Sequence, residues 1–158
     1  KKKGYQYTKR ILPPFVIPEC NITLENVWRY ITLYPEGPIN YDKAALILGT
    51  LDSRTIRKHI NLGLHMIKET DLRLSEFLST FTGYAEVPEM KAGQSEYTYL
   101  NLVVNEIENA KERMGETGYE TVPPVKYIHV IYVYKKCRNK LKVSLNRVFH
   151  TLLFFDTS

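Results

Sequence analysis

The chain has few cysteines and lacks a long apolar run, and both shortages exclude classes of protein. Its two cysteines, Cys20 and Cys137, lie far apart in a sequence of 158 residues. This spacing excludes a disulfide framework and a paired zinc knuckle. The most apolar run, from Tyr127 to Tyr134, is too short to span a bilayer, and we find no secretory signal. We therefore expect a cytoplasmic protein with reduced thiols and no membrane partner.

Signatures of catalysis are also missing. The four histidines show no metal-ligand spacing with cysteines or acidic residues. There is no glycine-rich phosphate loop and no serine or cysteine nucleophile motif. Glu106 and Glu108 are two residues apart on an expected helix, so they do not face each other and are better interpreted as a solvated face. We predict no catalytic site, no cofactor and no metal.

Positive charge is present and unevenly distributed. The net charge is +5, and residues 1–10 hold five basic and no acidic side chains. Residues 71–120 hold four basic and ten acidic side chains, whereas residues 121–158 hold seven basic and one acidic. An acidic middle between two basic ends favours a polyanionic partner, although solvated lysine tails would give the same pattern.

The apolar spacing predicts a mainly α protein. We expect helices over about 24–33, 41–48, from residue 53 to about 81, 96–114 and 141–155. Gly63 either splits the third of these or only weakens it. Residues 5–18 should be extended because of their prolines. The β-branched and aromatic residues 126–136 predict one strand, although a buried helix can look similar.

The loop predicted at 82–95 divides the chain into two parts. Residues 1–82 would form an extended arm and a helix-turn-helix domain, and residues 83–158 would form a helical region of unknown role.

Residues 41–60, "YDKAALILGTLDSRTIRKHI", have the pattern of a helix-turn-helix unit. Ala45 is small enough for two helices to press together, and Gly49 tolerates positive φ in the turn. Ile56 and Ile60 can dock the second helix against the first. With the preceding helix, this pattern predicts a three-helix core in the N-terminal half.

The second helix of this unit would present basic residues to DNA. The N-terminal residues of a recognition helix face base edges in the major groove, and arginine can bind guanine bidentately. His59 would lie at the DNA backbone or on the surface. The predicted DNA-binding residues are Ser53, Arg54, Thr55, Arg57 and Lys58. An ordinary helical pair with a solvated basic face is the alternative.

A second basic run supports two interpretations. Lys135, Lys136 and Arg138 could provide secondary phosphate contacts. They could equally keep an apolar flank soluble. The expected partner is double-stranded DNA, and a homodimer is compatible with the sequence.

Two stretches resemble transposon-encoded zinc-ribbon/helix-turn-helix DNA-binding proteins of bacteria. "GTLDSRTIRKHI" is similar to the pattern G-x-S-x-x-T-V-x-R-x-I of transposase-type and resolvase-type units, with one extra residue in the turn. "TKRILPPFVIPECNITLENVWRYI" resembles the segment that joins the zinc ribbon to such a unit. The resemblance covers residues 8–60, about a third of the chain.

This resemblance implies a DNA-binding protein of a mobile element and gives recognition roles to Ser53, Arg54, Thr55, Arg57 and Lys58. The chain departs from the family in two ways. It has no Cys-x-x-Cys pair, so the ribbon is lost or lies upstream of Lys1, and the family's catalytic acidic triad cannot be placed. A competing hypothesis is a protein-interaction or oligomerisation module that uses the amphipathic helices at 96–114 and 141–155.

Overall fold

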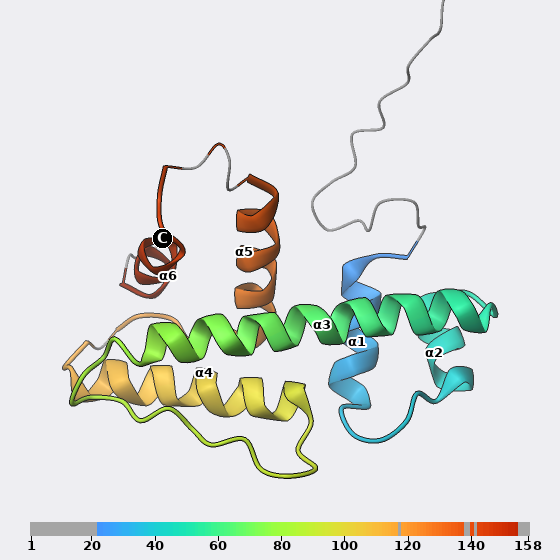
Figure 1. The fold of residues 1–158 in the computed structure, drawn as a ribbon, viewed down its shortest axis with the longest axis horizontal. Helices are drawn as coiled ribbons and strands as arrows, with labels where there is room; N and C mark the ends of the chain where they lie inside the picture. Colours follow the sequence, from blue (N-terminus) through green and yellow to red (C-terminus); the bar gives the residue numbers. More distant parts are fainter. Residues whose placement is uncertain (1–21, 117, 138–139, 141, 155–158) are drawn as a thin grey trace, which may run out of the picture.

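The protein is mainly α-helical (Figure 1). The computed structural model describes residues 22–116, 118–137, 140 and 142–154, and over these residues it contains no β-strand. The prediction for residues 5–18 lies outside them. The helices are α1 (Leu24–Leu33), α2 (Tyr41–Leu48), α3 (Ser53–Leu78), α4 (Glu96–Arg113), α5 (Pro124–Cys137) and α6 (Leu145–Phe154).

Polar side chains of the type that favours helix starts cap the first two helices. The Thr23 side chain accepts a hydrogen bond from the backbone N–H of Asn26 (3.2 Å), and Asn40 accepts one from Lys43 (3.1 Å). Helix α2 ends at Gly49, whose φ of 71° is in the left-handed region that glycine adopts readily. These signals fix the helix boundaries close to the predicted ones.

Helix α3 is the longest element, and α1, α2, α4 and α5 contact it. Helix α4 lies alongside α3, whereas α5 stands across it (Figure 1). Its 26 residues span about 39 Å. Gly63 lies inside this helix and does not break it. A Cβ at Gly63 would lie 2.6 Å from Val27 Cγ1 and 2.8 Å from Ile31 Cδ1. The glycine therefore allows α1 to approach α3 closely.

Helices α1 and α2 contact the first half of α3, and α4 packs along the second half. The loop 79–95 returns along the outside of α4, so α3 and α4 run in the same direction (Figure 1). None of the helices in the described ranges is long and apolar enough to cross a membrane.

The strand predicted at residues 126–136 is wrong, because this segment belongs to α5. Tyr127, Ile128 and Ile131 are its buried residues, and the spacing i, i+1, i+4 puts them on one face of a helix. A strand would have buried alternate residues instead. Packing against α3 and α4 outweighs the β-propensity of the individual side chains.

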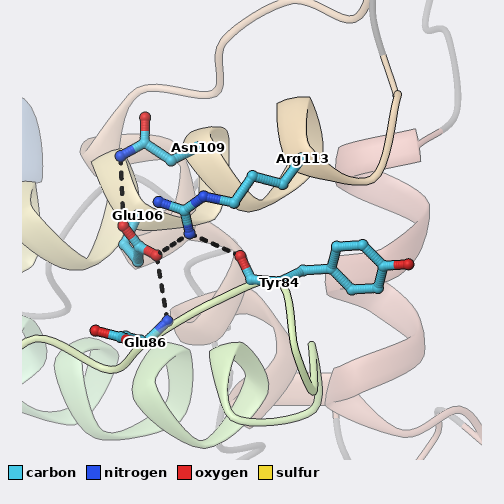
Figure 2. Close-up of polar contacts among 5 residues, drawn as sticks. All are labelled: Tyr84, Glu86, Glu106, Asn109 and Arg113. Carbon is cyan, nitrogen blue, oxygen red and sulfur yellow. Dashed lines mark hydrogen bonds and ion pairs between the residues drawn. The ribbon is translucent and has the colours of Figure 1, made fainter.

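A polar network holds the loop 79–95 on α4 (Figure 2). Glu106 accepts hydrogen bonds from Arg113 Nη1 (2.6 Å), from the backbone N–H of Glu86 (3.2 Å) and from Asn109 Nδ2 (3.3 Å). Arg113 Nη1 also donates to the carbonyl of Tyr84 (2.7 Å). Burial opposes ionisation of Glu106, but these bonds hold its pKa below the usual value.

The interpretation of Glu106 and Glu108 as a solvated face is therefore wrong. The Glu106 side chain is only 15% exposed. Glu108 pairs with Lys111 at 2.9 Å, and the lysine side chain is almost completely buried. Both carboxylates serve as internal partners for cations of α4 itself.

Candidate nucleic-acid interface

The corner between α2 and α3 is short and packed from inside. Four residues, 49–52, connect the two helices. Ile56 and Ile60 are each 1% exposed, and Leu48 is 4% exposed. The small residue fully buried at this corner is Ala44, whereas Ala45 is half-buried. The predicted docking role of the two isoleucines is thus consistent with their burial.

Asp52 caps the start of α3. Its carboxylate accepts hydrogen bonds from the backbone N–H groups of Arg54 (3.3 Å) and Thr55 (3.1 Å), and also from the Thr55 hydroxyl. The bond from the Thr55 side chain, more than any other contact, lowers the pKa of Asp52. The carboxylate thus occupies the anion-favouring end of the helix. In this arrangement Thr55 orients the cap, and its hydroxyl points to Asp52.

The three predicted cationic residues of α3 are exposed on its outer side. Arg57 Nε donates a hydrogen bond to the Tyr41 hydroxyl at the start of α2 (3.1 Å). Arg54 and Lys58 form no salt bridge with a carboxylate of the described residues. Two cations without a carboxylate partner among the described residues, and one guanidinium that the Tyr41 hydroxyl orients, therefore lie beside the corner. Ser53 is exposed beside them.

His59 lies in the core rather than at the surface. It is 3% exposed, and its Nδ1 is 2.6 Å from the carbonyl oxygen of Thr55. The expectation that this histidine would lie at the DNA backbone or on the surface is wrong. The burial of His59 could have been predicted from helical spacing, because position 59 falls on the same side of the helix as Ile56 and Ile60.

The structure brings the second basic run close to α3. Lys135 of α5 forms a salt bridge with Glu69 of α3 (2.6 Å), and Lys136 Nζ lies 5.3 Å from the centre of the Tyr132 ring. Arg138 lies outside the described residues. A cavity of about 300 Å³ between the two helices is lined by residues that include His65, Glu69, Lys135 and Lys136. The two lysines of this run thus border a cavity shared with α3, whereas none of the predicted DNA-binding residues of α3 lines it.

No family model, curated protein or solved structure matches this chain. The resemblance to transposase-type proteins therefore stays a prediction. Among the residues that the structure describes, no group of three or more His, Cys, Asp or Glu side chains could hold a metal ion.

Proposed function

We propose that this protein binds double-stranded DNA through a helix-turn-helix made by α2 and α3, with no catalytic site of its own. The observation that supports this proposal most directly is the placement of Arg54, Arg57 and Lys58. They are exposed in the first turns of α3, while the opposite side of these turns is packed into the core through Ile56 and Ile60. Recognition helices present their N-terminal turns to the major groove in this way.

Each residue of the corner has a distinct role in this proposal. Arg54 and Lys58 extend toward bases or flanking phosphates, and Tyr41 orients Arg57 by the hydrogen bond described above. Asp52 and Thr55 fix the helix start, and Ser53 and Lys136 provide phosphate contacts. The assignment to a mobile element or a transposase rests only on the resemblance of residues 8–60.

The alternative hypothesis, a protein-interaction or homodimerisation module, needs an apolar face free for a partner. On α4, Leu100, Val103 and Ile107 are each 0% exposed. On α6, Phe149 is 0% exposed and Leu153 is 1% exposed. Most of the apolar face of each of the two helices that this hypothesis uses is therefore covered by the chain itself. The exceptions are Leu102 of α4, which is 38% exposed, and Val148 of α6, which borders an apolar groove with α5. We favour DNA binding for this reason.

The proposal is tested by fluorescence anisotropy with a labelled duplex at several salt concentrations, first with a random sequence and then with a selected site. Binding through phosphates should weaken steeply as salt rises. Arg54→Ala and Arg57→Ala should each weaken specific binding by roughly 1–3 kcal/mol.

Lys91→Ala is the matched control, because Lys91 is exposed in the loop 79–95, away from the corner. Circular dichroism verifies that each variant keeps its helices. Unchanged affinity in both arginine variants, with the fold intact, would show that α3 does not contact the DNA.

A further inference from the structure

The exposed side of α3 carries a continuous row of cationic and polar side chains. We call this row the α3 stripe and define it as Arg54, Arg57, Lys58, Asn61, His65 and Lys68, all of them exposed. At about 100° of rotation per residue, the six positions fall within an arc of roughly 100° on one side of the helix. No acidic residue occurs from Ser53 to Lys68. The stripe is therefore longer than the first turns considered above.

The stripe is continuous because α3 does not break at Gly63. The sequence left open whether two helices meet at this position, in which case Arg54 and Lys68 would belong to different faces. Within one helix, they are separated by about 21 Å along the axis. This length exceeds the major-groove width of about 12 Å. A helix lying in the groove could then meet bases near its start and a phosphate backbone near Lys68.

Beyond Lys68, charged side chains of α3 form salt bridges. Glu69 follows Lys68 directly and binds Lys135 of α5 (2.6 Å). One turn further on, Arg73 pairs with Glu76 (3.1 Å). In contrast, Arg54, Lys58 and Lys68 make no salt bridge to a carboxylate in the described ranges. These three cations are therefore available for phosphate contacts.

We infer that the DNA-contacting surface extends along the whole α3 stripe, with Asn61 as a residue that reads a base and Lys68 as a phosphate contact. This inference rests on the proposed function. Asn61 lies between Lys58 and His65 on the stripe, and an asparagine amide in the major groove pairs bidentately with adenine. Lys68 lies beyond it at the far end of the stripe, where sequence-independent contacts are expected.

Site selection from a random duplex library separates the two roles. Asn61→Ala should remove the preference for adenine at one position of the selected site, with a loss of about 5- to 150-fold on the preferred sequence. Lys68→Ala should weaken binding to all sequences alike and reduce the slope of log affinity against log salt by about 1. Lys91→Ala should change neither quantity.

The outcomes distinguish this inference from the function on which it rests. If Arg54→Ala weakens specific binding while Asn61→Ala keeps the base preference and Lys68→Ala keeps the salt slope, the stripe beyond the first turns does not touch DNA. The inference then fails and the helix-turn-helix proposal stands. If the unaltered chain binds no duplex even at low salt, both fail. Because all three side chains are exposed, their replacement should leave the fold intact.

Discussion

Replacing Asp71 by asparagine should change how the stability of the protein depends on pH. Asp71 lies on α3, is 5% exposed, and has no hydrogen-bond partner for either carboxylate oxygen among the residues described. Burial, with a smaller contribution from Glu96, raises the pKa of Asp71 from 3.8 to about 8. At neutral pH the folded protein therefore holds this side chain mainly as the neutral acid.

The direction of the effect follows from proton binding in the two states. Below pH 3.8 the carboxyl is protonated in both the folded and the unfolded chain. As the pH rises toward 8, the unfolded chain releases this proton while the folded chain retains it, so stability falls. Each pKa unit corresponds to about 1.36 kcal/mol. The full shift would give about 6 kcal/mol. The effective dielectric constant inside a protein is higher than that of a dry interior, which reduces our expectation to roughly 2–4 kcal/mol.

Asp71→Asn removes this titration and keeps the shape of the side chain. Urea unfolding of both proteins between pH 4 and pH 8 measures the difference in their free energies of unfolding. This difference should shift in favour of the variant by roughly 2–4 kcal/mol as the pH rises. Burying the asparagine amide lowers the stability of the variant by the same amount at every pH, so it does not affect how the difference changes with pH. Asp42→Asn, at an exposed position of α2, should show no comparable shift. A flat difference for Asp71→Asn would refute the assignment of a buried neutral acid.

Two further predictions concern the contacts of α1. Gly63→Ala should lower the free energy of unfolding, measured with urea, by about 1–2 kcal/mol. Overpacking against Val27 and Ile31 outweighs the better helix propensity of alanine. Increased stability of the variant would contradict the close approach of α1 to α3. Trp28 Nε1 donates to His129 Nε2 (3.2 Å), and burial lowers the pKa of this histidine below 6.5. When the pH falls through this lowered pKa, protonation of His129 should break the bond and shift the tryptophan fluorescence. The free energy of unfolding should decrease as the pH falls below 6.5. If the fluorescence of His129→Phe changes with pH in the same way, His129 is not the origin of the change.

Local signals in the sequence were sufficient for most helix boundaries. Thr23, Asn40 and Gly49 each act through bonds to residues within a few positions, so their effect could be predicted without knowing the fold. The same holds for Trp28, which lies at helical spacing from Leu24 and Ile31 on the apolar face of α1 and is 4% exposed. Its partner His129 is 101 positions away, and no local pattern could have identified it.

Properties that depend on tertiary packing were not predictable in this way. Residues 126–136 looked like a strand because their side chains favour strands individually, and only the contacts of α5 with α3 and α4 show which face is buried. The burial of Asp71 depends on tertiary packing around α3, and that of Glu106 depends on the loop 79–95 lying on α4. For the candidate site, the exposed cations of α3 were expected, whereas the position of Lys135 beside Glu69 required the structure.

The C-terminal region has a structural role that helps to explain the length of α3. In proteins, helices gain most of their stability from packing of one apolar face. The second half of α3 packs through Leu74 and Phe77, which are 0% and 3% exposed. Phe77 packs against Phe149 of α6 with the rings tilted and their centres 5.3 Å apart, and α4 covers the same half (Figure 1). Although the division at 82–95 stays a prediction, residues 83–158 supply much of the surface that buries this half of α3. These residues thereby stabilise the helix on which the proposed DNA-contacting stripe lies.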